Sequence, residues 1–312
     1  MKAAVVTDFA QPPHYADFPE PIAGKDEVVV EVLAAGLHPR VRSQAGGFHY
    51  TSTGELPLVP GVDAVVRDPE GKVRYAVLDD STMGSMGSMA ERTVIGLNRS
   101  VVLPDEVDPV VVAAAMNPAM SSWVALRQRI DFGRGQSVLI LGATGNAGRM
   151  AIQVAKRFGA SEVMAVGRDT AKLAELSALG ADRTLRFEEV AEAADVDVVI
   201  DYLWGEPTGK AMVDLLTHRS DRGKPLTWLE VGAAAGPEAA IPAAALRSAR
   251  LQIVGSGIGS VPGRDFVKEL PQLAEAVAHG AFDVRARAVP LAQVAEAWTS
   301  TAGTSDRIVL VP

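Results

Sequence analysis

The clearest candidate for a ligand-binding site in this 312-residue sequence is a glycine-rich stretch between a predicted strand and a predicted helix. Residues 138–141 form an unbroken apolar run, which is typical of a strand buried on both faces of a parallel sheet. Gly142, Gly145 and Gly148 follow at intervals of three, and an apolar stripe with helical spacing then runs to Gly159. A strand, a glycine-rich turn and a helix in this order predict the start of a dinucleotide-binding unit.

The turn has the residue types that an anion-binding backbone requires. Small side chains let the main chain pass close to a pyrophosphate, and the N-terminus of the following helix presents unpaired N–H groups to that anion. An ordinary strand-to-helix turn without a ligand is the alternative interpretation. On the first interpretation we expect the whole turn to contact the cofactor: Gly142, Ala143, Thr144, Gly145, Asn146, Ala147 and Gly148.

The end of the next predicted strand, about 20 residues further on, is where such a unit selects its cofactor. An acidic residue there would bind the ribose hydroxyls of NAD, but here Gly167 is followed by Arg168. A guanidinium group suits a 2′-phosphate because its planar fork matches the phosphate oxygens, and Lys172 adds a second positive charge. We therefore predict NADPH as the cofactor. In the alternative, Arg168 pairs locally with Asp169 or Glu175, and Asp169 binds the ribose.

Strands and helices continue to alternate after this point, which predicts an α/β fold with a doubly wound parallel sheet. Ligands of such sheets lie beyond the carboxyl ends of the strands. The candidates for further cofactor contacts follow the third, fourth and fifth strands: Tyr202, Leu203, Gly232, Ala233 and Ser256. For Tyr202 and Leu203, a role as core residues without a ligand is an equally good interpretation.

The first third of the chain predicts a separate, mainly-β unit, because short strand-like runs alternate there with proline and glycine. Its polar candidates for a cleft are His38, His49 and Tyr50. Residues 110–116 then predict a helix, which we expect Asn117-Pro118 to interrupt before helical character resumes.

The composition excludes several classes of function. The absence of cysteine excludes disulfides, thiolate zinc sites and a cysteine nucleophile, and the five histidines include no pair with ligand spacing. A net charge of −8 is unfavourable for general nucleic-acid binding. No secretory signal is visible, and no apolar run in the sequence approaches the length of a membrane span, so we expect a cytoplasmic protein.

Several segments resemble the medium-chain dehydrogenase/reductase superfamily, in its zinc-free quinone oxidoreductase branch. MKAAVVTDFAQPP and EVVVEVLAAGLHP are similar to its N-terminal strands, QSVLILGATGNAG to its cofactor loop, and DRIVLVP to its closing strand. The resemblance covers essentially the whole chain. It implies a GroES-like β domain formed by residues 1–114 and 261–312, with a Rossmann domain at 115–260. It also implies NADPH-dependent reduction of a small-molecule substrate, either a quinone or an activated alkene, by a homodimer paired through the last Rossmann strand.

The substrate side departs most from the family. Gly61-Val62-Asp63 stands where zinc alcohol dehydrogenases have Gly-His-Glu, and His38 stands where quinone reductases usually have asparagine. His49 and Tyr50 lie about where a tyrosine is common, and Ser121 replaces a threonine near the nicotinamide but keeps its hydroxyl.

Without zinc, a developing oxyanion needs a hydrogen-bond donor or a proton. His38, His49 and Tyr50 are the candidates for that role, with water as an equal alternative. Two other functions stay open: an NADPH-binding sensor without turnover, and an alcohol dehydrogenase, although neither zinc nor a strong base is visible for the latter.

Overall fold

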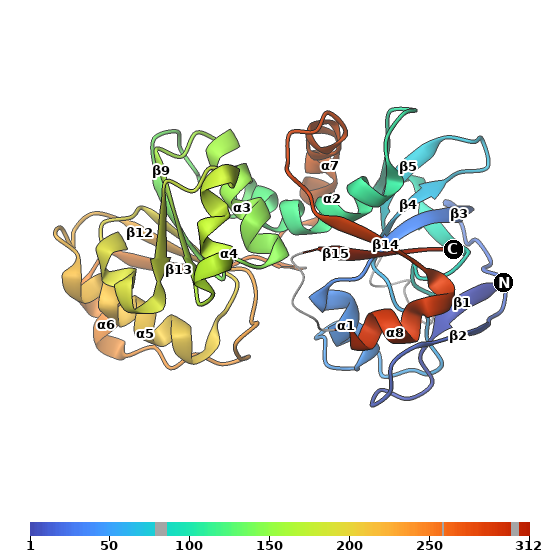
Figure 1. Ribbon diagram of the computed structural model, residues 1–312, viewed down its shortest axis with the longest axis horizontal. Helices are drawn as coiled ribbons and strands as arrows, with labels where there is room; N and C mark the ends of the chain where they lie inside the picture. Colours follow the sequence, from blue (N-terminus) through green and yellow to red (C-terminus); the bar gives the residue numbers. More distant parts are fainter. Residues whose placement is uncertain (79–85, 258, 301–305) are drawn as a thin grey trace. The chain divides into compact units, whose positions relative to one another are not determined.

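The computed structural model describes residues 1–78, 86–257, 259–300 and 306–312. The chain divides into two compact units (Figure 1). The first unit contains Met1–Asn117 and Val267–Pro312, so it is built from both ends of the chain, whereas the second unit is the contiguous segment Pro118–Phe266.

The second unit is built on a six-stranded sheet in which every neighbouring pair of strands is parallel, in the order β10-β9-β8-β11-β12-β13. The direction of winding reverses between β8 and β11, and the crevice at such a switch point is where doubly wound sheets bind ligands. The fold class predicted from the sequence is confirmed. The strand bounds are Ser137–Leu141 (β8), Glu162–Gly167 (β9), Arg183–Arg186 (β10), Val198–Asp201 (β11), Leu226–Glu230 (β12) and Leu251–Gly255 (β13).

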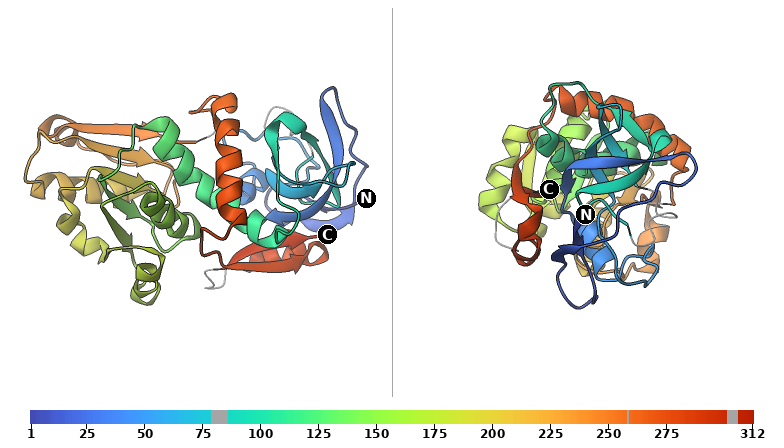
Figure 2. Two further views of the ribbon diagram at one scale, coloured as in Figure 1. Left: turned by 90° about the horizontal axis from the view of Figure 1, so that it is seen from above. Right: turned by 90° about the vertical axis from the view of Figure 1, so that its right-hand side faces the viewer.

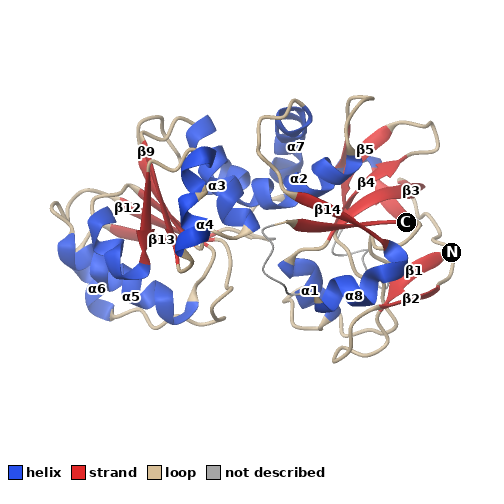
Figure 3. Cartoon of the chain, viewed as in Figure 1, coloured by secondary structure: helices blue, strands red, loops and turns tan. Residues whose placement is uncertain are grey.

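Helices separate these strands along the chain (Figure 3). One face of the sheet is buried by the amphipathic α5, whose Met212 and Leu215 pack in one core cluster with Leu139, Val199 and Trp228. Burial on both faces explains why these strands are continuous apolar runs in the sequence. The helical bounds are Asn146–Arg157 (α3), Thr170–Ala174 (α4), Leu176–Leu179 (η3), Phe187–Ala193 (η4), Gly205–His218 (α5) and Ala243–Ser248 (α6).

The first unit holds a mostly antiparallel sheet in the order β14-β15-β3-β4-β5-β7, with β6 also paired to β3, and a separate β1-β2 pair. Near the C-terminus, β15 pairs antiparallel with β3, so the tail lies beside the N-terminal strands (Figure 2). The strand bounds are Lys2–Val5 (β1), His14–Asp17 (β2), Glu27–Gly36 (β3), Asp63–Arg67 (β4), Val73–Val77 (β5), Arg92–Gly96 (β6), Ser100–Val102 (β7), Ala286–Pro290 (β14) and Arg307–Val311 (β15).

The helical segments around this sheet are short, except for two helices that contain the boundaries between the units, α2 and α7. Their bounds are Pro39–Ala45 (α1), Leu97–Arg99 (η1), Pro109–Val124 (α2), Gly263–Ala278 (α7), Leu291–Gln293 (η5) and Val294–Thr299 (α8). The π-helix Ala125–Arg129 (η2) directly follows α2 and belongs to the second unit.

Helix α2 corrects the expectation that Asn117-Pro118 interrupts the helix. Pro118 lies inside a continuous helix, where it removes one backbone donor. Met116 and Ala119, on either side of it, are fully buried, and this packing outweighs the local cost. Together with η2, the segment Pro109–Arg129 is 21 residues long and apolar enough to cross a membrane, contrary to our expectation, but 72% of its most apolar window is buried inside the protein, as in a core helix.

Candidate functional site

The three glycines of the turn between β8 and α3 occupy three different environments, and each accounts for glycine in a different way. Gly142 has a φ of +81°, a conformation that other L-residues rarely adopt. A Cβ on Gly148 would lie 2.4 Å from the carbonyl oxygen of Gly142, so only glycine lets α3 pack this close to the turn. Gly145 is different: it is exposed, and the nearest atom to its Cβ position is 3.5 Å away. The fold does not require glycine at position 145, but a closely approaching pyrophosphate would.

The N-terminus of α3 faces this open position. Gly145 is the N-cap of the helix, and no side chain of the described residues caps it. The first turn of α3 also contains no acidic residue that would repel an anion. The N–H groups of Asn146, Ala147 and Gly148 therefore start a helix whose positive end is available to a phosphate.

The two acidic residues near the end of β9 are engaged with other groups. The Asp169 carboxylate accepts hydrogen bonds from the backbone N–H groups of Ala171 at 3.0 Å and Lys172 at 3.2 Å, which makes it the N-cap of α4. Glu175 pairs with Arg149 of α3 at 3.3 Å. Both partners proposed in the local-pairing alternative for Arg168 are thus bound elsewhere.

Arg168 itself is exposed directly after Gly167, the last residue of β9. Within the described ranges its guanidinium has no hydrogen-bond or ion-pair partner. Lys172 lies half-buried on the first turns of α4. The two cations predicted to select the cofactor therefore lie beside the same strand end, with Arg168 available to an anion.

A buried carboxylate organises the turn after β11. Asp201 is fully buried and accepts hydrogen bonds from the backbone N–H groups of Leu203 (2.8 Å) and Trp204 (3.1 Å). Its other oxygen accepts from Thr208 Oγ1 at 2.5 Å and from Trp228 Nε1 at 3.0 Å. These bonds hold a backbone that is strained at Trp204, where φ is +50°. Asp201 was not among the residues predicted from the sequence, although an acidic residue at the end of an apolar strand was the available signal.

The structure brings the predicted residues Ser121 and Tyr202 together. Their hydroxyl oxygens lie 3.0 Å apart, and Ser121 Oγ also donates to the carbonyl oxygen of Pro118 at 2.7 Å. Burial raises the pKa of Tyr202 to about 12, against the opposing effect of hydrogen bonds with Ser121 and Ser122. The phenol is therefore protonated at neutral pH.

The other predicted residues of this edge lie close to the same turn. A Cβ on Gly142 would lie 3.1 Å from Leu203 Cδ2, and a Cβ on Gly232 would lie 3.3 Å from the carbonyl oxygen of Tyr202. Ser256, which follows β13, is buried and its N–H donates to the carbonyl oxygen of Glu230 at the end of β12. Ala233 directly follows Gly232. The predicted residues therefore line the carboxyl ends of neighbouring strands, as the doubly wound fold requires.

In the first unit, His38 belongs to a buried polar cluster. His38 Nε2 lies 2.9 Å from Asp63 Oδ1, Tyr75 donates to Asp63 Oδ2 at 2.7 Å, and Ser88 donates to the Asp63 carbonyl oxygen at 2.7 Å. All four residues are buried, with His38 only 2% exposed. Burial lowers the pKa of His38, and Asp63 opposes this shift. His38 is thus a largely neutral imidazole enclosed by protein, and the sequence did not identify Asp63 or Tyr75 as its partners.

Arg307 places a positive charge in the same interior. This residue of β15 is buried and donates from Nη1 to the carbonyl oxygen of Leu37 at 3.1 Å. Burial lowers its pKa to about 10, while Asp63 opposes the shift and Arg42 adds to it. Arg307 therefore stays charged at neutral pH and helps to balance the Asp63 carboxylate.

His49 and Tyr50 lie in a different environment from His38. They follow α1, and their rings stack with centroids 4.3 Å apart and an interplanar angle of 28°. His49 Nδ1 lies 2.8 Å from Thr51 Oγ1, while Tyr50 is 70% exposed. The three predicted catalytic residues thus comprise one enclosed imidazole and one solvent-facing aromatic pair.

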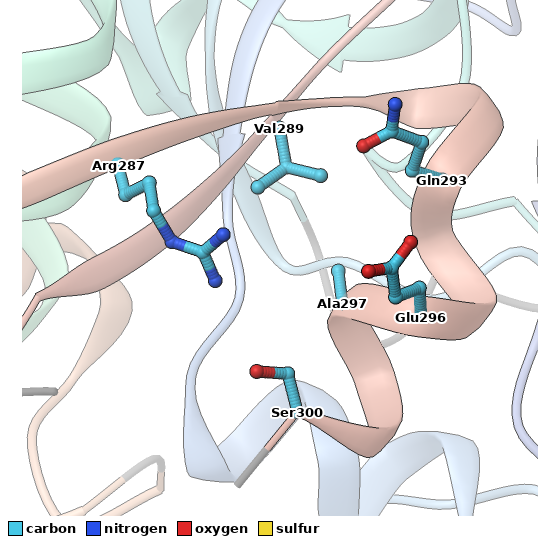
Figure 4. Close-up of a pocket in the computed structure, with 6 residues that line it drawn as sticks. All are labelled: Arg287, Val289, Gln293, Glu296, Ala297 and Ser300. Atoms are coloured by element: carbon cyan, nitrogen blue, oxygen red, sulfur yellow. The ribbon is translucent and has the colours of Figure 1, made fainter. Parts of the chain in front are cut away.

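A small hollow lined by residues between 287 and 300 lies apart from these groups in the sequence (Figure 4). Side chains of β14, η5 and α8 line it, and none of its described lining residues is a predicted site residue. The lining residues are Arg287, Val289, Gln293, Glu296, Ala297 and Ser300.

Comparison with known proteins finds similarity to dehydrogenases and reductases. The family model described as "Zinc-binding dehydrogenase" matches residues 147–278. The probable NADPH-dependent quinone reductase tdiC of Emericella nidulans is 27% identical, with complete coverage of both chains. The chloroplastic NADPH-dependent alkenal/one oxidoreductase of Arabidopsis thaliana is 31% identical over 57% of this chain, which spans about half (50%) of that relative.

Solved structures match the chain over its whole length. A probable oxidoreductase from Mycobacterium abscessus is 27% identical with a TM-score of 0.79, covering 100% of this chain and 99% of that one. The quinone oxidoreductase from Thermus thermophilus, which was also solved in complex with NADPH, is 25% identical with a TM-score of 0.82 and complete coverage of both chains.

The residues present do not fit the zinc site that the name of the family model implies. The sequence has no cysteine, and the described residues contain no group of three or more histidine, aspartate or glutamate side chains placed to hold a metal. His38 and Asp63 are hydrogen-bonded to each other in the interior.

Proposed function

Because this chain belongs to the medium-chain dehydrogenase/reductase superfamily, in its quinone oxidoreductase branch, we propose that it reduces quinones or activated alkenes without zinc. The protein is an oxidoreductase, and its cofactor is NADPH. When bound, NADPH supplies a hydride, which a quinone or the β carbon of an enone can accept.

The observation that carries this proposal is the open position at Gly145, beside the uncapped N-terminus of α3. A pyrophosphate is the anion that this arrangement suits, because backbone N–H groups can approach it without a side chain in the way. The turn from Gly142 to Gly148 would hold that group.

The two ends of the cofactor would be held on either side of the turn. Arg168 and Lys172, next to Gly167, would bind the 2′-phosphate, since guanidinium and ammonium groups pair well with phosphate oxygens. The residues proposed to hold the nicotinamide half follow the other strands: Ser121, Tyr202, Leu203, Gly232, Ala233 and Ser256.

We propose His49 and Tyr50 as the source of the proton that the reduced substrate needs. Their partial exposure supports this role, because a proton donor must exchange its proton with solvent between turnovers. His38, also predicted as catalytic, is enclosed and bonded to Asp63, which favours a role in positioning the start of α1.

Zinc independence is supported by the donor set. The buried carboxylate and imidazole of Asp63 and His38 satisfy each other, and there is no thiolate in the chain to complete a tetrahedral site. We expect turnover to survive exhaustive treatment with a chelator and to gain nothing from added zinc.

The proposal is tested by following NADPH oxidation with a panel of quinones and enones, using protein shown by calorimetry to bind NADPH. We expect turnover with at least one of these acceptors. Binding of NADPH without turnover of any acceptor would favour the sensor interpretation instead, and oxidation of alcohols by NADP⁺ as the faster reaction would favour the dehydrogenase interpretation.

We also propose a cytoplasmic homodimer paired through β13. This strand is last in the order of the six-stranded sheet, and no other described strand pairs with its outer edge, where a second copy could add a strand. Light scattering coupled to size-exclusion chromatography tests the dimer, and a monomer at micromolar concentration would contradict it.

A further inference from the structure

The position of Tyr202 in the sheet assigns it to one half of the cofactor. Arg168, proposed to bind the 2′-phosphate, follows β9, and the turn proposed to bind the pyrophosphate follows β8. In the order β9-β8-β11-β12, the strand on the other side of β8 is β11, which Tyr202 directly follows. A dinucleotide laid across the carboxyl ends of these strands therefore brings its nicotinamide half, and not its adenosine half, to Tyr202.

The hydrogen bonds of α2 fix the direction in which Tyr202 donates. Ser121 Oγ donates to Pro118 O at 2.7 Å, and Ser122 Oγ donates to Ala119 O at 3.2 Å. A serine hydroxyl has a single proton. With both serine protons directed at carbonyls of their own helix, the 3.0 Å contact between Ser121 and Tyr202 is made by the phenol proton.

A phenol that donates to Ser121 presents lone pairs in its other directions, so toward a ligand it is a hydrogen-bond acceptor. Its proton is retained at neutral pH, because burial raises the pKa of Tyr202 to about 12. The residue is half-buried, and its backbone N–H donates to the carbonyl oxygen of Leu141 at 3.2 Å. The next two residues donate to Asp201, and the Cβ position of Gly232 lies 3.3 Å from the carbonyl oxygen of Tyr202. Tyr202 is thus a fixed acceptor beside the proposed nicotinamide position.

We propose that the phenol oxygen of Tyr202 accepts a hydrogen bond from the carboxamide NH₂ of the nicotinamide, with Ser121 setting the direction of the phenol proton. This inference rests on the proposed function. The nicotinamide ribose hydroxyls are the other donors on that half of the cofactor, and the choice of ligands below separates the two sources.

The test measures binding of NADP⁺ and of its 3-acetylpyridine analogue by isothermal titration calorimetry. The analogue has a methyl group where the carboxamide has NH₂, so it keeps the ribose but loses the donor. For Tyr202→Phe we expect NADP⁺ to bind about three- to tenfold more weakly, the value of one hydrogen bond, with less than about twofold change for the analogue. Equal losses for both ligands, or no loss for either, would overturn the assignment.

Three further variants distinguish loss of this hydrogen bond from loss of folding. Ser121→Ala frees the phenol proton, so we expect the same selective loss for NADP⁺, and Ser121→Thr should restore wild-type binding because it keeps the hydroxyl. Tyr15→Phe removes a phenol hydroxyl from a 40% exposed residue of β2 and should leave both affinities unchanged. Wild-type protein that binds neither ligand would overturn the proposed function itself.

Discussion

Two buried aspartates, one in each unit, differ in where their partners come from. Asp201 accepts two hydrogen bonds from the backbone that immediately follows it, at Leu203 and Trp204. Asp63 accepts from His38 and Tyr75, which lie 25 and 12 residues away in other elements. The first arrangement shapes a turn at the carboxyl edge of the parallel sheet, and the second closes the interior of the β unit.

The difference indicates how each carboxylate contributes to function. A turn shaped by its own aspartate presents backbone and neighbouring side chains outward, where a ligand can use them. Each oxygen of the Asp63 carboxylate instead accepts a hydrogen bond from a buried protein group, His38 or Tyr75, and the charge of Arg307 acts on it through space. We therefore expect changes at the sheet edge to alter cofactor binding, and changes in the enclosed cluster to alter stability.

Replacing the two aspartates is the strongest test of this contrast. Asp201→Ala leaves two side-chain donors and two backbone donors without an acceptor, so we expect a loss of at least about 3 kcal/mol in the free energy of unfolding. NADPH should also bind at least about tenfold more weakly, because the turn is no longer held. Asp63→Ala should cost a similar stability but change the NADPH affinity of the folded protein by less than about twofold. Urea unfolding and calorimetry measure both, and a matching loss of affinity in Asp63→Ala would break the contrast.

The glycines of the cofactor turn separate folding from binding. For Gly148→Ala we expect about 1–3 kcal/mol of destabilisation together with weaker NADPH binding, because the new Cβ would collide with the Gly142 carbonyl oxygen 2.4 Å away. For Gly145→Ala the Cβ has room in the protein, so only the affinity for NADPH should fall. Gly133→Ala, with no atom closer than 3.8 Å to the Cβ position, is the control. Unchanged NADPH binding by Gly145→Ala would contradict the proposed pyrophosphate position.

A substitution at Arg168 tests whether the sheet edge also determines the choice between NADPH and NADH. Removing a charged partner of the 2′-phosphate should cost about 1.5–3 kcal/mol, so Arg168→Ala should weaken NADPH about ten- to a hundredfold and leave NADH nearly unchanged. Arg183→Ala is the matched control, because it removes a guanidinium paired with Glu192 from the other end of β10, where Arg183 is in register with Met164 and not with Gly167. Equal losses for both cofactors in fluorescence titrations would refute Arg168 as the selecting residue.

The enclosed cluster predicts a smaller effect that depends on pH. Burial lowers the pKa of His38 below the ordinary 6.5, and besides Asp63 the charged groups acting on it are Arg307 and Arg40. Below about pH 6.5 the unfolded chain therefore binds a proton that the folded protein resists, and the free energy of unfolding falls as the pH is lowered. Urea unfolding between about pH 5 and 8 should show a shallower pH dependence for His38→Gln than for the wild type. Identical slopes would mean that His38 is protonated as readily in the folded state.

Local features of the molecule could be predicted from the sequence. The turn from Gly142 to Gly148 is defined by residues next to one another, so the strand, turn and helix could be predicted from spacing alone. To propose Arg168 as the residue that selects the cofactor, only the position of the end of the next strand had to be predicted. The helical interruption expected at Pro118 was wrong, because the buried packing around it is a tertiary property.

Groups assembled from distant segments could not be predicted in this way. His38 was singled out by residue type, but nothing in its neighbourhood indicates that β4 supplies Asp63 and β5 supplies Tyr75 to enclose it. Ser121 and Tyr202 were each predicted to approach the cofactor, yet their contact with one another depends on how α2 packs beside the end of β11. The side-chain partners within the β unit could therefore be identified only from the three-dimensional structure.

The pairing of β15 with β3 has a consequence for the order in which the chain can fold during synthesis. Val309 and Leu310 pair with Gly36 and Ala35, and Arg307 satisfies the carbonyl oxygen of Leu37. The segment Pro118–Phe266 is contiguous, so it can collapse as soon as it leaves the ribosome. In the β unit, which is begun first, most of β3 can pair with β4 and β6, but its end at Ala35 and Gly36 stays without a partner strand until Val309 and Leu310 are made. A nascent chain therefore carries a short unpaired strand end, a site of possible aggregation, for most of its synthesis.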